Sequence, residues 1–156
     1  MENDKLHFIK EEMFLLLNNL SADTKGKWGK MNAQQMVEHV SAFFTVSTEK
    51  LKFNLVTPEE QLPKYKEFLY SDKEFRENTK APATVLGDET LPLQYPSVSI
   101  AIQKLHLAVE NFINYFKNES GKKTLHPVFG MLSFDEWILL HFKHVRHHLR
   151  QFELLV

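Results

Sequence analysis

The chain has 156 residues, of which 43% are hydrophobic and 25% are charged, and it has a formal net charge of −1 at pH 7. This composition is typical of a globular protein. No apolar run in the sequence approaches the ~18–20 residues of a membrane span, so we do not expect a membrane as a partner. The chain also lacks the excess of positive charge of most nucleic-acid-binding proteins, so we do not expect nucleic acid as a partner. Cysteine is absent, so any metal must be held by nitrogen and oxygen atoms.

The N-terminal region lacks the basic start, apolar middle and cleavage site of a secretory signal, which predicts a cytoplasmic protein. From residue 4 to residue 20, apolar side chains recur at steps of three and four residues, for example at Leu6, Ile9 and Met13. This spacing is typical of an amphipathic helix, and we predict the first helix over residues 4–20.

A second helix is predicted over residues 32–50, because Asn32 and Gln35 have the spacing of a capping box. Residues 51–96 contain five of the six prolines and no sustained period. We expect this connection to be partly helical, with helix starts near Thr57 and Ser71. Its length is typical of a lid or a site wall, and a packed crossover without a chemical role is an equally good interpretation.

Apolar residues at helical spacing predict a third helix over residues 97–118. Ser133 and Glu136 form a second capping box, which begins a fourth helix that extends to about residue 152. Four long amphipathic segments without a convincing strand predict an all-α fold, a four-helix bundle that forms a single domain over residues 1–156.

Five of the eight histidines lie in the last 31 residues. At about 100° per residue, His141, His144 and His148 share one face of the fourth helix, beside apolar neighbours that predict an inward orientation. Buried imidazoles need polar partners. Either each ring bonds a protein group, or His144 and His148, one turn apart, chelate a cation.

His39 lies on the apolar stripe of the second helix, together with Met36 and Phe43. Metal sites in helical bundles are built from side chains on facing helices, so His39 is the natural partner of the His144 and His148 pair. Three imidazoles leave open coordination positions, which is typical of a reactive site rather than a structural one. We therefore predict His39, His144 and His148 as metal ligands.

Two segments, residues 28–39 (WGKMNAQQMVEH) and residues 144–151 (HVRHHLRQ), resemble the DinB-like (YfiT-like) metalloprotein superfamily. The stretch His126-Pro-Val-Phe-Gly130 resembles a subgroup with His-Pro-x-Phe-Gly before the last helix. The resemblance implies a four-helix bundle that holds zinc, nickel or a similar ion at positions equivalent to His39, His144 and His148. The broader family often has Arg-Gly where this chain has Leu149 and Arg150, so the contacts of that pair are not carried over.

Members of that superfamily with known activity are similar to thiol-dependent transferases or isomerases. The resemblance implies a metal-dependent enzyme that activates water or a low-molecular-weight thiol for transfer, isomerisation or hydrolysis of a small molecule. His141, Gln35 and His126 are candidate catalytic groups, with a structural role as the alternative for each. A non-catalytic metal- or ligand-binding bundle is the competing hypothesis, and a homodimer stays open.

Overall fold

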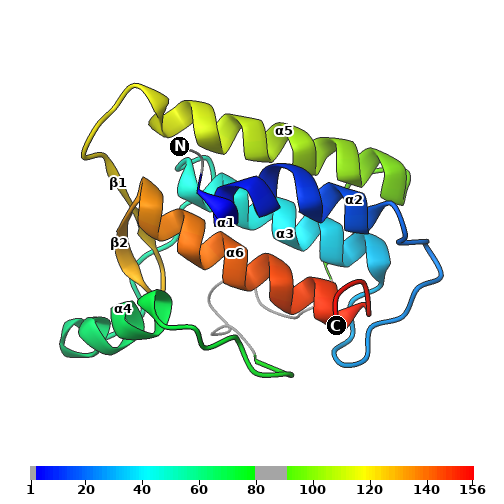
Figure 1. Cartoon of the computed structure of the whole chain (residues 1–156), viewed down its shortest axis with the longest axis horizontal. Helices are drawn as coiled ribbons and strands as arrows, with labels where there is room; N and C mark the ends of the chain where they lie inside the picture. Colours follow the sequence, from blue (N-terminus) through cyan, green and yellow to red (C-terminus); the bar gives the residue numbers. More distant parts are fainter. Residues whose placement is uncertain (1–2, 80–90) are drawn as a thin grey trace.

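Three long helices lie side by side in the computed structural model, which describes residues 3–79 and 91–156 (Figure 1). They are α3 (Ala33–Ser47), α5 (Val98–Lys117) and α6 (Phe134–Gln151), and α3 packs against both of the others. Each agrees with a predicted helix to within a few residues. Among the described helices, none combines the length and the apolarity that crossing a bilayer requires.

The predicted first helix is a helical run of three parts that packs across α6 and α5. It consists of α1 (Asp4–His7), a π-helical turn η1 (Phe8–Glu12) and α2 (Met13–Leu17). Phe8 and Ile9 of the π-helical turn are buried. The run ends at Leu17, three residues before the predicted end.

Both predicted capping boxes are present. Asn32 Oδ1 accepts from Gln35 N at 2.8 Å, and Gln35 Oε1 accepts from Asn32 N at 2.8 Å. Ser133 Oγ accepts from Glu136 N at 3.2 Å, and Glu136 Oε1 accepts from Ser133 N at 3.0 Å. These bonds satisfy backbone N–H groups that a helix start leaves unpaired, so they define where α3 and α6 begin.

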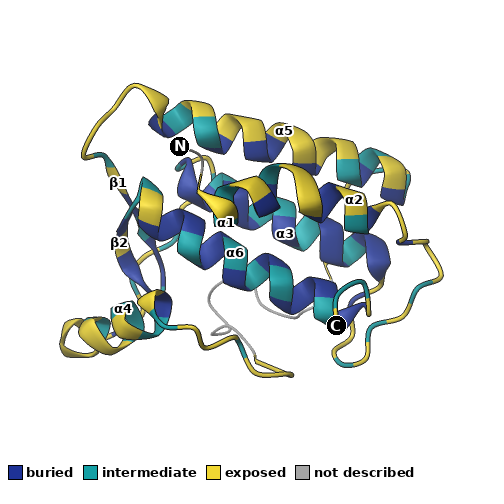
Figure 2. Cartoon of the chain, in the orientation of Figure 1, coloured by how far each residue is buried: buried dark blue, intermediate teal, exposed yellow. Residues whose placement is uncertain are grey.

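The core lies where α3, α5, α6 and the N-terminal run face one another (Figure 2). Fully buried side chains there include Ile9, Met13, Leu17, Phe44, Phe112 and Trp137. Two linked hydrogen bonds are buried in this core. Trp137 Nε1 donates to Thr124 Oγ1 at 2.8 Å, and the Thr124 hydroxyl donates to Ser47 O at 2.8 Å. The bond to Thr124 satisfies the indole N–H of Trp137, which would be costly to bury without a hydrogen-bond partner.

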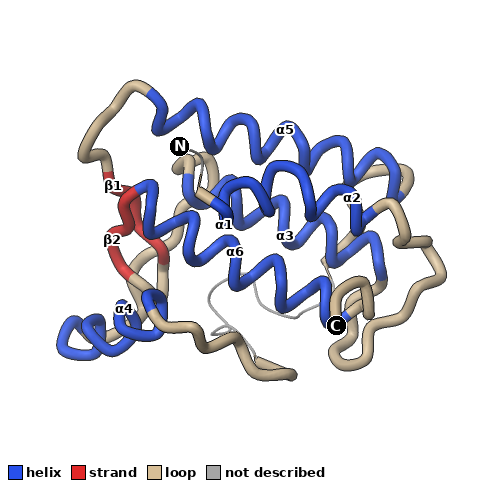
Figure 3. Tube along the Cα trace, in the orientation of Figure 1, coloured by secondary structure: helices blue, strands red, loops and turns tan. Residues whose placement is uncertain are grey.

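The prediction of an all-α four-helix bundle is wrong, because residues 123–133 form an antiparallel hairpin (Figure 3). Its strands are β1 (Lys123–His126) and β2 (Gly130–Ser133), with Lys123 opposite Ser133 and His126 opposite Gly130. Gly130 has φ of +83°, a conformation that favours glycine. Strands of four residues are too short to show a clear alternation of apolar and polar side chains, so the sequence pattern missed them.

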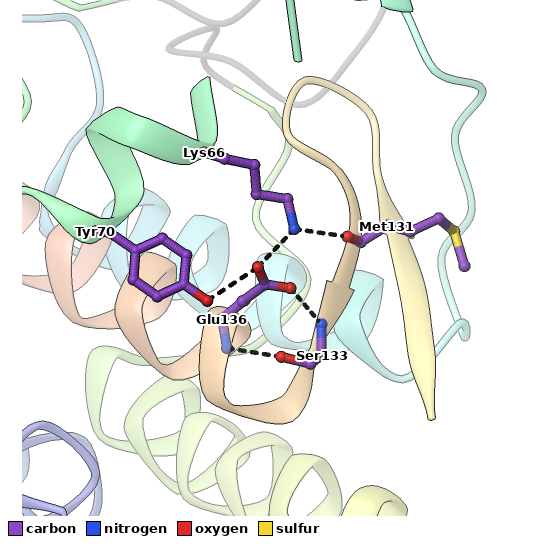
Figure 4. Close-up of polar contacts among 5 residues, drawn as sticks. All are labelled: Lys66, Tyr70, Met131, Ser133 and Glu136. Atoms are coloured by element: carbon purple, nitrogen blue, oxygen red, sulfur yellow. Dashed lines mark hydrogen bonds and ion pairs between the residues drawn. The ribbon is translucent and has the colours of Figure 1, made fainter. Parts of the chain in front are cut away.

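The connection between α3 and α5 contains a short 3₁₀ turn, η2 (Glu59–Gln61), and helix α4 (Leu62–Tyr70). Glu136 at the start of α6 holds α4 in place (Figure 4). Its Oε2 accepts from Lys66 Nζ at 2.7 Å and from Tyr70 OH at 3.1 Å. Lys66 also donates to Met131 O at 3.0 Å, so the same lysine joins α4 to β2.

No helix begins at Ser71, contrary to the sequence-based expectation. Residues 71–77, which we call the strap, run along α6 instead. Lys143 Nζ donates to the carbonyl oxygens of Ser71, at 2.8 Å, and of Lys73. Glu74 pairs with Arg146 Nε at 2.9 Å and with Arg150 Nη1 at 2.8 Å. The strap therefore covers the cationic face of α6. The part of the connection from 80 to 90 lies outside the described residues.

Candidate metal centre

The structure brings the ring nitrogens of the three predicted ligands together between α3 and α6. His144 Nε2 lies 3.1 Å from His39 Nε2 and 3.1 Å from His148 Nε2. The ligand atoms of all three rings lie within 4.8 Å of one another. This group could hold a metal ion, since one helical turn separates the two histidines of α6 and the third faces them from α3.

The ring of Phe43 lies against the cluster, whose three histidines differ in their exposure. The ring of Phe43 stands edge-on to His39, at 5.1 Å between centroids, and to His144, at 4.9 Å. His148 is buried, with 2% of its surface exposed, whereas His39 and His144 are only partly buried. His39 and His144 are therefore the more exposed members of the cluster.

Gln151, at the end of α6, determines the tautomer of His148. Its Oε1 lies 2.7 Å from His148 Nδ1, and its Nε2 donates to Trp28 O at 2.9 Å. A carbonyl oxygen only accepts hydrogen bonds, so the amide nitrogen of Gln151 must face Trp28 and the amide oxygen must face His148. His148 Nδ1 therefore carries a proton and donates it to Gln151, which leaves a lone pair on Nε2 of the neutral ring.

The loop before α3 is shaped to fit Gln151. Lys27 N donates to the backbone oxygen of Gln151 at 2.7 Å. Gly29 has φ of +78°, and a Cβ atom there would lie 2.8 Å from Gln151 Nε2. Glycine is required at this position by both the backbone conformation and the close approach. Sequence reasoning missed this role of Gln151; its spacing of three residues after His148 was the available signal.

Hydrogen bonding among neutral rings cannot satisfy all three Nε2 atoms. If His144 Nε2 donates to His148, it has no lone pair with which to accept from His39. If His144 Nε2 instead accepts from His39, its lone pair and the lone pair of His148 Nε2 face each other without a proton between them. One linear bond is the most that the neutral set can make, whereas a cation among the three nitrogens would interact with every lone pair.

The spacing of the nitrogens also suits a metal ion. Bonds of about 2.0–2.1 Å to a tetrahedral or octahedral ion place neighbouring ligand nitrogens about 2.9–3.4 Å apart. Two of the three pairs have this spacing, at 3.1 Å each. The third pair lies within 4.8 Å, so the donor set is compatible with one ion held by all three rings.

Burial keeps these imidazoles neutral at neutral pH. Desolvation, with a contribution from His147, lowers the pKa of His39 to about 4. Desolvation and the neighbouring rings also lower the pKa values of His144 and His148 well below the ordinary value. Neutral imidazole is the form that binds metal, so at neutral pH a metal ion would not have to displace protons from these nitrogens.

The candidate catalytic group His126 lies at the hairpin turn. Its Nδ1 accepts from Val128 N at 3.0 Å and from Phe129 N at 3.2 Å, which closes the turn. Its ring packs near Phe43 and Trp137. The described contacts therefore give His126 a structural role, and it reaches the candidate metal centre only through the ring of Phe43.

His141 and Gln35 are also occupied by protein contacts. His141 is 1% exposed, stacks on Phe44 with centroids 3.9 Å apart, and has its Nε2 3.3 Å from Ser47 Oγ. Gln35 Oε1 accepts the hydrogen bond from Asn32 N in the α3 capping box, and Gln35 Nε2 donates to Leu91 O at 2.9 Å. In the described part of the chain, neither makes a hydrogen bond to the three-histidine cluster.

His147 is buried, with rings of Trp28, Phe75 and His148 around it. Its Nδ1 makes no hydrogen bond with the described residues. His106 lies on α5 and stacks on Phe14 with ring centroids 3.4 Å apart. It lies outside the cluster.

We expect the metal-free protein to lose stability in mild acid. Desolvation lowers the pKa of His126 to about 3, whereas an unfolded histidine titrates near pH ~6.5. The unfolded chain then binds more protons, so the stabilisation is complete above pH ~6.5 and is lost as the pH falls toward 3. At pH 5 this residue alone should lower the free energy of unfolding by about 2 kcal/mol.

Urea unfolding in EDTA at pH 7.5, 6 and 5 measures this loss. His126→Asn is the matched control, because the amide oxygen can replace Nδ1 as acceptor and does not titrate in this range. Between pH 7.5 and 5 the variant should lose about 2 kcal/mol less than the natural chain. Equal losses in the two proteins would contradict the assigned role of His126.

Comparison with known proteins adds a family but no activity. A family model described as "Protein of unknown function (DUF1569)" matches residues 75–154, just over half of the chain. The matched part contains His144, His148 and Gln151, whereas His39 lies outside it. No match was found among curated proteins or among solved structures.

Proposed function

The chain belongs to the DUF1569 family, whose function is unknown, and from its own residues we propose that it binds one divalent transition-metal ion. The ligands would be Nε2 of His39, His144 and His148. The observation that carries this proposal is the convergence of three neutral imidazole nitrogens that hydrogen bonds among the rings cannot all satisfy. Direct metal analysis of protein purified without a histidine tag tests it, with close to one ion per chain expected.

Zinc or nickel is our proposal for the ion. Imidazole is a good ligand for both, and the chain has no cysteine that would favour a softer ion. The resemblance to the DinB-like superfamily supports the same choice and remains part of the proposal.

We infer a reactive centre rather than a purely structural one. A bound ion with open positions would lower the pKa of a coordinated water or thiol and so provide a nucleophile at neutral pH. The protein's own residues would position and shield it: Gln151 holds a proton at His148 Nδ1, and Phe43 keeps water from one side. The reaction class would be transfer, isomerisation or hydrolysis of a small molecule.

A non-catalytic metal- or ligand-binding protein is the second candidate. The observation that favours it is the state of the expected catalytic groups: described contacts already occupy the side chains of Gln35, His126 and His141. The two candidates differ in whether the ion keeps an exchangeable position, which is a measurable property.

Gln151 provides a test that leaves the three ligands in place. Gln151→Leu removes the acceptor of the His148 Nδ1 proton, and loss of such a partner typically weakens metal binding about 10- to 100-fold. Gln151→Glu retains an acceptor and should bind metal at least tenfold more tightly than the leucine variant. Competition with a chromophoric chelator measures both affinities.

The control for Gln151 is Gln103→Leu, since Gln103 is exposed on α5. Urea unfolding in EDTA separates lost packing from lost metal affinity, because the metal-free proteins report packing alone. Unchanged metal affinity in Gln151→Leu would show that the amide does not orient His148.

A further inference from the structure

A cavity of about 730 Å³ lies between α4, the strap and the hairpin turn. Its apolar lining is aromatic: Tyr65 and Phe68 come from α4, Phe75 from the strap and Phe129 from the hairpin turn. The rings support one another, with centroids 5.5 Å apart for Tyr65 and Phe129 and 5.2 Å for Phe68 and Phe75. The volume lies within the usual range for small-molecule sites.

The same cavity is lined by three cationic side chains, Lys64, Lys73 and Arg76. Within residues 3–79 and 91–156, no carboxylate is seen in an ion pair with any of them. Glu74 is the one carboxylate among the described lining residues, and it is already paired with two arginines of α6. Among the described residues, the lining therefore carries more positive than negative charge beside its aromatic surface.

The backbone that carries these cations is anchored. Lys143 Nζ donates to Lys73 O, and Thr79 N donates to Arg76 O at 3.1 Å. Lys143 itself is buried and lies 4.8 Å from the ring centroid of Phe68. The backbone at Lys73 is consequently held to α6, and Arg76 lies in the turn that follows.

The cavity lies beside the candidate metal centre. Phe75 contacts His147 with centroids 5.9 Å apart, and His147 contacts the proposed ligand His148 at 5.0 Å. On the other side, Phe129 contacts His126 at 5.2 Å. One ring thus separates the cavity wall from His148.

We propose that this cavity binds a small organic anion with an aromatic body, of the size of an arene carboxylate. The aromatic lining would take the ring, and Lys64, Lys73 and Arg76 would attract the acid group. The proposal rests on the cavity alone and does not require a metal ion. Its failure would therefore leave the metal proposal standing, and the reverse also holds.

Calorimetric titration with 2-naphthoate and with uncharged 2-naphthalenemethanol tests the proposal, in EDTA so that no metal binds the carboxylate. The natural chain should bind the carboxylate about tenfold more tightly than the alcohol. Each exposed charge pair contributes up to about fivefold, so the double variant Lys73→Gln, Arg76→Gln should lose about tenfold in naphthoate affinity. Its affinity for the alcohol should not change.

Lys117→Gln, which removes an exposed cation of α5 outside the cavity lining, is the matched control and should leave both affinities unchanged. Circular dichroism would verify that the variants fold. Three results would overturn the proposal: no binding of naphthoate, equal affinity for the acid and the alcohol, or naphthoate binding that survives the double substitution.

Discussion

His144→Ala is expected to reduce metal occupancy from close to one ion per chain to nearly none. His144 is the central member of the cluster, since its Nε2 lies 3.1 Å from each of the other two Nε2 atoms. Two remaining imidazoles on different helices are a weak chelate, so affinity should fall at least about a thousandfold. Elemental analysis after gel filtration measures the occupancy, and a chelator competition gives the affinity.

The matched control is His106→Ala, which also removes one histidine but at an exposed position on α5. It should keep full occupancy, which excludes a general loss of histidine-mediated metal uptake. His39→Ala repeats the test from α3 and should also lose the ion. Full occupancy in His144→Ala, with the variant folded by circular dichroism, would refute the proposed ligand set.

The long helices could be predicted because their signals are local. The capping pairs at Asn32 and Ser133 satisfy the first N–H groups of α3 and α6, and the apolar stripes behind them are several turns long. Both predicted starts agree with the structure to within one residue. The face shared by His144 and His148 follows from the same helical period, so the sequence could place them together.

The hairpin and the strap depend on contacts that the local sequence does not show. Thr124 of β1 donates a hydrogen bond to the backbone oxygen of Ser47 at the end of α3, more than 70 residues earlier in the sequence. The cations Lys143 and Arg146 have the spacing of a solvated helix face, yet their partners lie some 70 residues away on the strap. The sequence alone does not show whether a charged side chain is solvated by water or paired with a carboxylate of the protein.

The neighbourhood of the candidate site was less predictable than its three central histidines. The spacing of Gln151 from His148 could suggest a contact between them, but its other partner, Trp28 O, is a backbone atom at the far end of the chain. His126 and His141 were attractive as chemical groups, but the hairpin turn and the core use their ring nitrogens. Residue type indicates what a side chain can do, and only the fold determines which contacts occupy it.

Cobalt substitution is expected to show an ion that a small thiol can reach. Three imidazoles do not fill a tetrahedral or octahedral sphere, and His39 and His144 are only partly buried. Adding 2-mercaptoethanol to the cobalt form should produce a new sulfur-to-cobalt charge-transfer band in the near ultraviolet. Absorption spectroscopy during the titration measures both the band and the affinity for the thiol.

Ethylene glycol is the control for the thiol, because it has a similar size and no sulfur, and it should leave the near-ultraviolet spectrum unchanged. The His39→Ala protein, treated with cobalt in the same way, should show no band, because it should hold no ion for the thiol to reach. A spectrum that responds to neither thiol, azide nor pH would mean that a fourth protein group completes the coordination sphere. That outcome would end the case for catalysis and leave a structural metal, because an ion without an exchangeable position cannot activate water or a thiol.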